Sequence, residues 1–321
     1  MSYFFVSEAM NGWRIEKACA ALFPGRTRTQ WLDFLQQGKI RSRKGIWAKG
    51  DRVTAGDEMI FLEIPPKADE WLPAWTNPST ISVAWESESV LVVDKPPGLP
   101  TLPLHMQDAP TAAGALYARF GIASIPASEA GIVNRLDTGT SGLLLAGRTR
   151  NAQEKLRHRF ASHHIEKNYR ALVHGRFPEG VIWLSGRVIT TGGPKVRYER
   201  YERDEKPCRV GNQLAVSRVI CLWTGSQYSL VEVTTRFGRR HQVRIQLADA
   251  GFPLFNDHVY GTYDGWSENE HFLWACRVTF ADPESDTLHT VSSCRLPSHW
   301  LELARKLGFE TKLGFVEAFE S

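Results

Sequence analysis

The stretch "GIVNRLDTGTSGLLLAG", residues 131–147, constrains the fold more than any other part of this 321-residue chain. Its apolar run, Leu143–Ala146, is typical of a strand that is buried on both faces. The small Gly, Thr and Ser residues before that run favour a tight loop, because they suit turns and hydrogen-bond their own backbone. The sequence therefore places a charged triplet, residues 135–137 (RLD), on a tight loop at the entrance to a core strand.

The triplet itself suggests chemistry. In an extended segment, side chains two residues apart point the same way, so we expect Arg135 and Asp137 on one side and Leu136 toward the core. A neighbouring cation keeps an aspartate ionised even when it is partly buried. An ionised, poorly solvated carboxylate is a good nucleophile or base. A loop salt bridge without catalytic meaning is the alternative interpretation of the same residues.

A second group of charges lies in "RFGRRHQVRIQLADAG", residues 236–251, which predicts a helix that stops at Gly251. Arg240 and Arg244 are four residues apart and are expected to share a helix face. Helix N-termini attract anions. The residues expected near this one are Arg239, His241 and Gln242. Apolar residues are interleaved with these charges, which argues against an ordinary solvated face.

One tyrosine falls in a strand pattern. "EKNYRALVHG" places Tyr169 on the same strand face as the apolar residues Ala171 and Val173. A tyrosine on a buried face needs a partner for its hydroxyl. The alternative is a core tyrosine with no role in chemistry.

The chain divides into three zones by pattern. Residues 1–64 predict two short helices and a small sheet, residues 65–82 are a Pro-rich linker, and residues 83–321 are a larger α+β domain. Between residues 26 and 52 eight basic residues stand against two acidic ones, an excess larger than the net charge of +4 of the whole chain. This basic cluster suits contact with a phosphate backbone, or is a solvated face.

The cysteines and the hydropathy of the chain indicate the cellular compartment to expect. The five cysteines form no CxxC pair, so neither a disulfide framework nor a structural zinc site is expected. No apolar run reaches the roughly 18 residues of a membrane span. The N-terminus carries no pattern typical of a signal peptide. These features predict a cytoplasmic protein without membrane contact.

Four motifs resemble those of the RluA-type RNA pseudouridine synthases and follow the order of that family. "VNRLDTGTSGLLLAG" is similar to HRLDxxTSGLLLxA, "VLVVDKPPGLP" to a strand with DKPxGL, "EKNYRALVHG" to KxYxALVxG, and "GRRHQVRIQLADAGFPLFNDHVYG" to GRxHQIRxHLxxxGxPIxGDxxYG. Residues 12–63 resemble the S4-like RNA-binding domain that many members carry in front. The resemblance spans roughly residues 12–282.

The resemblance implies an α+β fold: a catalytic domain with a mixed, largely antiparallel sheet flanked by helices, behind a small N-terminal S4-like α/β domain. It also implies that specific uridines in structured RNA become pseudouridine by glycosidic bond cleavage, base rotation and C–C bond formation. The reaction involves no redox change and no external nucleophile, so no cofactor and no metal are implied. The implied partner is RNA, with large-subunit rRNA favoured over tRNA because of the S4-like domain, and a monomer is expected.

The same resemblance assigns roles to residues of this chain. Asp137 is the implied catalytic carboxylate, Arg244 would pair with it, and Tyr169 would stack on the uracil and take the C5 proton. The implied substrate- and RNA-binding residues are Arg135, Asn134, Arg239, His241 and Gln242, with Arg26, Arg28, Lys39 and Arg41 in the N-terminal domain.

The chain departs from the family pattern where RNA contact is expected. The histidine before RLD is Asn134, the second histidine of the helix motif is Gln246, and the GD glycine is Asn256. These changes leave a non-catalytic RNA-binding or ribosome-assembly protein as the alternative function. A glycosidase-like enzyme is a weaker alternative, because no second carboxylate stands beside Asp137 in the motif.

Overall fold

The computed structural model describes residues 1–26, 28–65, 67, 76–103, 110–121, 125, 129–190, 193, 195–201, 213–267, 269–293 and 295–313. The chain forms two compact units. The first comprises Met1–Pro78 and Leu102–Ala130, and the second comprises Ser79–Thr101 and Gly131–Ser321. Residues 66 and 68–75 of the expected linker lie outside the described residues.

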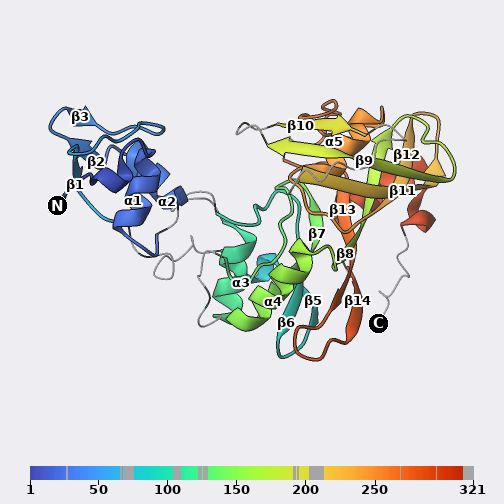
Figure 1. The fold of residues 1–321 in the computed structure, drawn as a ribbon. Helices are drawn as coiled ribbons and strands as arrows, with labels where there is room; N and C mark the ends of the chain where they lie inside the picture. The colour runs from blue at the N-terminus through green and yellow to red at the C-terminus, as the bar shows by residue number, and fades with distance from the viewer. Residues whose placement is uncertain are drawn as a thin grey trace. The chain divides into compact units, whose positions relative to one another are not determined.

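The first unit contains a small four-stranded sheet with the order β1-β4-β2-β3 (Figure 1). Its elements are β1 (Ser2–Phe5), α1 (Ile15–Leu22), α2 (Arg28–Gln36), β2 (Ile40–Ser42), β3 (Gly45–Ile46), β4 (Glu58–Phe61) and α3 (Ala112–Phe120), with a 3-10 turn at Glu8–Met10. A further 3-10 turn, Pro78–Thr80, spans the point in the chain where the first unit ends and the second begins. Aromatic rings close its core: Trp31 and Phe61 are fully buried, and their ring centroids lie 5.7 Å apart. The two helices and small sheet expected from the sequence pattern are therefore present.

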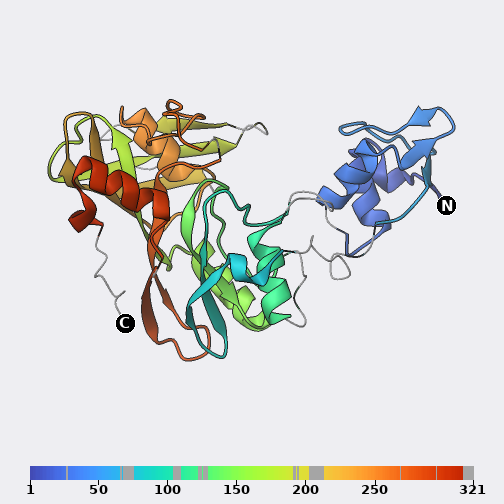
Figure 2. The ribbon, with the colours of Figure 1, turned by 180° about the vertical axis from the view of Figure 1, so that it is seen from behind.

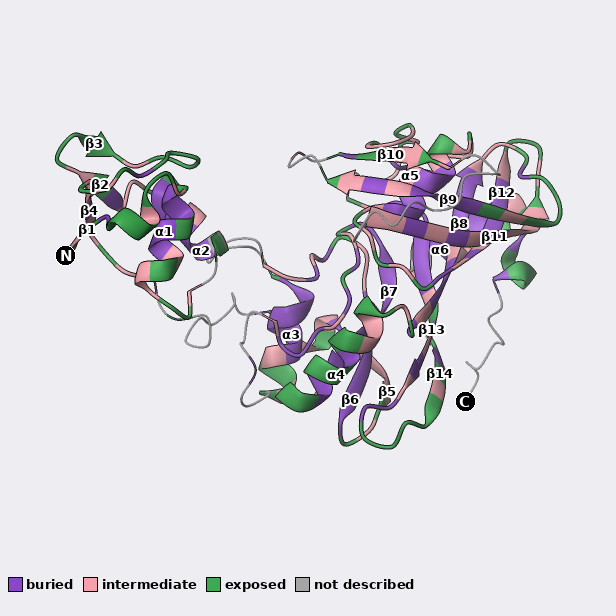
Figure 3. Ribbon diagram, in the orientation of Figure 1, coloured by how far each residue is buried: buried purple, intermediate pink, exposed green. Residues whose placement is uncertain are grey.

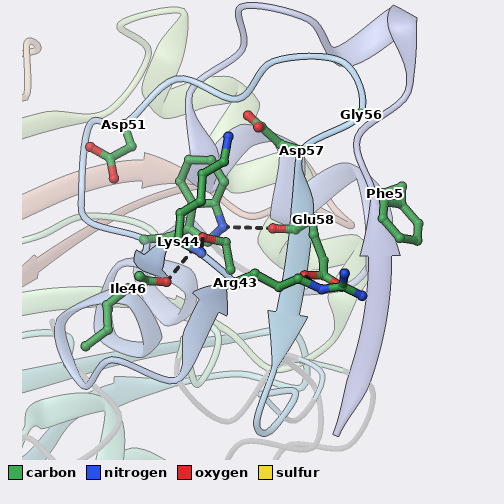
Figure 4. Close-up of a pocket in the computed structure, with 11 residues that line it drawn as sticks. Phe5, Arg43, Lys44, Ile46, Asp51, Gly56, Asp57 and Glu58 are labelled. Atoms are coloured by element: carbon green, nitrogen blue, oxygen red, sulfur yellow. Dashed lines mark hydrogen bonds and ion pairs between the residues drawn. The ribbon is translucent and has the colours of Figure 1, made fainter.

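The side of this small sheet away from the core carries a shallow cavity of about 500 Å³ (Figure 4). The β2–β3 hairpin and the start of β4 form most of its lining. Within it Arg43 pairs with Glu58 at 3.1 Å, and the Trp47 indole donates to the Glu58 carbonyl at 3.3 Å. None of the residues expected to take part in catalysis lines this cavity.

The second unit is built on one ten-stranded sheet (Figure 1). The strand order is β10-β9-β11-β12-β8-β13-β7-β6-β5, with β14 paired to β13. The strands are β5 (Ser82–Glu86), β6 (Val90–Lys95), β7 (Ser141–Gly147), β8 (Glu166–His174), β9 (Val181–Thr190), β10 (Val196–Arg200), β11 (Leu214–Thr224), β12 (Tyr228–Thr235), β13 (Leu273–Ala281) and β14 (Leu288–Ser292). Among the named strands β7 and β13 pair in parallel and the other pairs are antiparallel, so the sheet is mixed and largely antiparallel, as predicted.

Among the described residues, three helices cover this sheet: α4 (Arg150–Ala161), α5 (Gln242–Asp249) and α6 (Ser298–Leu307), the last followed by a 3-10 turn at Glu310–Lys312. Helix α6 lies across the strands and packs Trp300 against Leu172 and its neighbours (Figure 2). Ile245 of α5 packs on the face that carries Ala215 of β11. The strand registers place Tyr169 on that same face, because Ala215, Val219, Val233 and Tyr169 follow one another across β11, β12 and β8.

The buried strand predicted from residues 143–146 is confirmed as part of β7. Strands β6 and β7 are buried at every residue (Figure 3). Gly142 in β7 has φ +106°, and a Cβ there would lie 2.3 Å from the Ala275 carbonyl oxygen of β13. Only glycine allows that close approach, so this position fixes how the loop before β7 enters the sheet. None of the described helices is long and apolar enough to cross a membrane.

Candidate active site

Asp137 is the centre of a network of charges in the second unit. Its side chain is 24% exposed and lies on the loop that leads into β7. The Arg244 guanidinium, from the first turn of α5, donates through Nη1 to Asp137 Oδ2 at 3.0 Å. The ion pair expected between these two residues is therefore present, although 107 residues separate them in the chain.

Arg244 is held from its other side by a second carboxylate, Asp257. Its Nε donates to Asp257 Oδ2 at 2.7 Å, and its Nη2 donates to Asp257 Oδ1 at 2.8 Å. Arg244 is 5% exposed and Asp257 is 1% exposed. A two-point pair of this kind fixes the plane of the guanidinium, so that Nη1 points to Asp137.

The electrostatics favour an ionised Asp137. Burial raises the pKa of Asp137, but the charge and hydrogen bond of Arg244, with His241 and His271, lower it more, and the net pKa is below its usual value. Burial likewise opposes ionisation of Asp257, yet the hydrogen bonds and charge of Arg244 bring its pKa down to about 2. Both carboxylates are therefore charged at neutral pH.

His241 lies on the open side of Asp137. It has φ +53° at the start of α5, and its Nε2 lies 3.8 Å from Asp137 Oδ1. Its Nδ1 is 2.9 Å from the hydroxyl of Tyr260, which accepts the Val196 backbone N–H at 2.8 Å. When the Tyr260 hydroxyl donates its own hydrogen to Nδ1, the neutral imidazole carries its proton on Nε2, facing Asp137. Burial lowers the pKa of His241, which favours this neutral form.

The backbone on both sides of Asp137 is fixed from the segment after β6. The Lys95 ammonium, 1% exposed, donates to the carbonyls of Pro96, Leu99 and Thr138 at 2.9, 2.7 and 3.1 Å. The Thr101 hydroxyl donates to the Leu136 carbonyl and accepts the Leu136 N–H, at 2.7 and 3.1 Å. Residues 95–101 thus hold the loop one residue before and one residue after Asp137.

His271, two residues before the start of β13, gives a third support to the loop that carries Asp137. Thr140 Oγ1 lies 2.8 Å from His271 Nε2, and the Thr140 N–H donates to the Asp137 carbonyl at 3.0 Å. Burial and the charge of Arg244 lower the pKa of His271 to about 3, so the imidazole is neutral. Gly139 leaves room for that ring, because a Cβ there would lie 2.6 Å from His271 Nδ1.

Tyr169 presents a neutral phenol to the site. It is 9% exposed on β8, and among the described residues none hydrogen-bonds its hydroxyl. Burial raises the pKa of Tyr169, and the Asp137 charge raises it further, which places that charge close by. The expected partner for a buried tyrosine hydroxyl is thus missing from the described part of the chain.

Several predicted residues lie elsewhere. Arg135 is exposed, and the cation that pairs with Asp137 is Arg244 instead. Arg240 does not share the Arg244 site, because α5 begins only at Gln242 and Arg240 donates to the Gly193 carbonyl at 2.9 Å. Arg239 is half-buried and donates to the Leu214 carbonyl at 2.9 Å.

Two residues expected to contact RNA are used internally. Asn134 is 6% exposed, and its Oδ1 accepts the Leu145 N–H at 2.8 Å. Gln242 is 4% exposed, and its amide group bonds with Arg239, Val216, Ser217 and Thr235. Both side chains therefore brace the fold around the site.

The predicted basic residues of the first unit all have partners within it. Arg26 donates to the Pro65 carbonyl at 3.0 Å, Arg28 pairs with Glu16 at 3.0 Å, Lys39 pairs with Glu63 at 2.5 Å, and Arg41 donates to the Gly38 carbonyl at 3.1 Å. Arg28 and Arg41 are exposed. Contact of these residues with RNA stays a prediction.

The sequence interpretation missed four residues of the site: Lys95, Asp257, Tyr260 and His271. The first three lie inside the quoted motifs, "DKPPGLP" and "FNDHVYG", so their positions carried a signal. His271 carried none. Among the described residues, no group of three or more His, Cys, Asp or Glu side chains could hold a metal ion.

The chain is similar to known proteins over most of its length. A family model described as RNA pseudouridylate synthase matches residues 89–249. The chain is 28% identical over 256 residues to ribosomal large subunit pseudouridine synthase D of Pseudomonas aeruginosa, covering 78% of this chain and 75% of that protein. It is 30% identical over 266 residues to the protein of the same name from Zymomonas mobilis, covering 80% and 79%.

Two further likenesses extend this. The chain is 27% identical over 305 residues to the uncharacterized RNA pseudouridine synthase YlyB of Bacillus subtilis, covering 94% of this chain and 96% of that protein. Among solved structures, human RNA pseudouridylate synthase domain containing 4 shares the fold with a TM-score of 0.52 and 18% identity, covering 71% of this chain and 93% of that one.

Proposed function

This chain belongs to the RNA pseudouridylate synthase family and is an RNA pseudouridine synthase; on that premise, we propose that Asp137 is its catalytic carboxylate and large-subunit rRNA its substrate. The observation that carries the assignment of Asp137 is the chain of ion pairs Asp137–Arg244–Asp257. The names of the relatives from Pseudomonas aeruginosa and Zymomonas mobilis support the choice of RNA.

The reaction asks one thing of the carboxylate. The N1–C1′ bond of a uridine breaks, the uracil turns, and C5 bonds to C1′; C5 then loses its hydrogen as a proton, and N1 takes up a proton, so the product is an isomer of the substrate. Asp137 attacks C1′ or removes the C2′ proton, and either route begins from the ionised form. Because Arg244 holds the pKa of Asp137 below its usual value, that form is present at neutral pH.

Asp257 lets the charge on Asp137 change during the reaction. Once Asp137 is bonded to C1′ or protonated, it no longer compensates the buried guanidinium of Arg244. A buried cation without a partner is strongly unfavourable. The two hydrogen bonds from Arg244 to Asp257 keep that cation paired throughout. We assign Arg244 to positioning Asp137, and Asp257 to positioning Arg244.

Tyr169 suits stacking on the uracil ring. Its phenol lies on the strand face that carries the site, and the raised pKa keeps it protonated. A phenol with a raised pKa is not ionised for taking the C5 proton, so we assign Tyr169 to stacking and not to base catalysis. His241, neutral and facing Asp137, is the other group placed to touch the base.

The uridine must leave its stack to reach Asp137, as for other enzymes that act on a base. Arg135 is exposed two residues before Asp137, where it can occupy the gap left in the RNA. We therefore propose that Arg135, predicted from the sequence to contact RNA, does so by filling the gap that the flipped uridine leaves. Loss of Arg135 should then weaken substrate capture more than the chemistry that follows.

The test is a map of pseudouridines in total rRNA and tRNA, made by carbodiimide-stop sequencing from cells with and without the gene. We expect one or a few rRNA sites to be lost on deletion and restored by wild type but not by Asp137→Asn. A lost site in tRNA alone would refute the rRNA assignment. Restoration by Asp137→Asn would refute the assignment of Asp137.

A further inference from the structure

We propose that Lys167, Arg239 and His163 form a binding site for an RNA backbone phosphate beside the Asp137 site. The proposal rests on the proposed function, and it adds Lys167 and His163 to the residues that contact RNA. Lys167 and His163 pack against two phenylalanine rings, Phe160 and Phe237, and Arg239 follows Phe237 by two residues in the chain.

Lys167 is the buried member of this cation cluster. It is 4% exposed, its Nζ donates to the Phe237 carbonyl at 2.8 Å, and it lies 4.2 Å above the centre of the Phe160 ring. Among the described residues it has no ion pair with a carboxylate. An ammonium has three donors, so this arrangement leaves two without a described partner.

Arg239 connects the cluster to the active site. It stands two residues before His241, on the loop between β12 and α5. Its Nε donates to the Leu214 carbonyl, and no described carboxylate pairs with its guanidinium. Phe237, two residues before Arg239, accepts the Lys167 hydrogen bond and packs its ring against His163, so one short segment joins the three residues. The Arg239 charge also lowers the pKa of Lys167 and of His163.

His163 has an unusual conformation and an unused nitrogen. Its φ is +62°, its ring centroid lies 4.1 Å from that of Phe237, and its Nδ1 is buried without a hydrogen-bond partner. A buried polar nitrogen without a partner is unfavourable unless something else occupies the place. An oxyanion would accept a hydrogen bond from the protonated ring.

Cations gathered without a carboxylate fit an anion from outside the protein. Burial and the Arg239 charge lower the pKa of Lys167 to about 7, and the negative charge of a bound phosphate would raise that pKa again. Lys167 and Tyr169 are two residues apart on one face of β8, about 7 Å along the strand. A nucleotide that stacks its base on Tyr169 therefore has its own backbone within reach of Lys167.

The experiment measures RNA affinity as a function of salt, with a fluorescein-labelled oligouridylate as the probe. The variants are Lys167→Met and His163→Gln, and the matched control is Lys155→Met, a lysine of α4 that pairs with Glu284. Each protein phosphate contact in single-stranded RNA adds about 0.7 to the slope of log affinity against log salt concentration. We expect Lys167→Met to reduce the slope by about that amount and to weaken binding about tenfold at low salt.

His163→Gln should weaken binding about threefold, and Lys155→Met should change neither quantity. Thermal unfolding of each variant shows whether it is folded. If Lys167→Met does not fold, the affinity and salt slope of His163→Gln test the phosphate site. A folded Lys167→Met or His163→Gln protein with wild-type affinity and slope would overturn the phosphate site. The assay does not depend on turnover: wild type that binds as predicted yet forms no pseudouridine would refute the proposed function and leave this site standing.

Discussion

Arg244 and Asp257 share two hydrogen bonds of 2.7 and 2.8 Å in a fully buried pair, and that pair aims the remaining guanidinium nitrogen at Asp137, 3.0 Å away. Asp137, the proposed catalytic carboxylate, is therefore kept ionised by a residue of α5, and the orientation of that residue is fixed by Asp257. Asp257 orients Arg244, and Arg244 in turn sets the charge of Asp137. Replacing each of these residues should therefore have a different effect.

Replacing Asp257 should damage both stability and rate. Asp257→Asn leaves Arg244 buried with only Asp137 to compensate it, and breaking a buried pair costs about 3 kcal/mol. We expect the free energy of unfolding in urea to fall by about that amount, and the single-turnover rate to fall about 100-fold. Asp282→Asn is the control, because Asp282 is buried among Ser87 and Ser89 hydroxyls. It should lose stability and keep its rate; equal rates for both variants would contradict the positioning role.

Replacing Arg244 should move the acid limit of the reaction. In the wild type the pKa of Asp137 is lowered, so the rate should hold as pH falls and decline only below the usual aspartate range, near 4. In Arg244→Met the guanidinium charge and hydrogen bond that oppose burial are lost, so the pKa of Asp137 rises and the decline begins at higher pH. A pH profile of the single-turnover rate measures this; a slower variant with an unmoved acid limb would exclude the electrostatic account.

Lys95→Met should loosen the Asp137 loop. The ammonium satisfies three carbonyls, one of them next to Asp137, and a methionine satisfies none. Leaving buried carbonyls unpaired costs about 2 kcal/mol or more. We expect lower stability in urea and a kcat that falls more than KM rises, because the loop is misplaced while RNA contacts elsewhere remain. A variant with changed KM alone would argue against this role.

The first unit should contribute affinity without chemistry. Arg41 is exposed in a basic stretch and is expected to contact phosphates. Arg41→Ala should lower the salt dependence of rRNA binding by about one contact and leave the single-turnover rate at saturating protein unchanged. Filter binding at several salt concentrations measures the first quantity. An unchanged salt slope with a large loss of turnover would contradict the assignment.

Local structure around the site followed from the sequence, because hydrophobic periodicity reports on neighbours in the chain. The pattern predicted β7 and its loop, the helix that carries Arg244, and the face of Tyr169. Periodicity alone could not show that the Asp137 partner is a residue 107 positions away, since that contact depends on how strands pair across the sheet; only the family resemblance implied the pairing with Arg244.

The pattern also misjudged polar residues whose partners are backbone groups. The sequence predicts Gln242 at a helix end that attracts anions, yet its side-chain amide makes hydrogen bonds with β11, β12 and the Arg239 backbone. Lys95 reads as a charge at a strand end, yet it is buried because three carbonyls surround it. Whether a polar side chain finds all its hydrogen-bond partners inside the protein depends on the tertiary fold, and no spacing in the sequence reveals it.

The most direct test compares purified wild type and Asp137→Asn on large-subunit rRNA isolated from cells that lack the gene. Pseudouridine is quantified by carbodiimide-stop sequencing, while RNA affinity and thermal unfolding confirm that the variant binds and folds. We expect wild type to complete the modification and Asp137→Asn to be slower by about 10⁴-fold or more. Pseudouridine formed by Asp137→Asn at the wild-type rate would contradict the account.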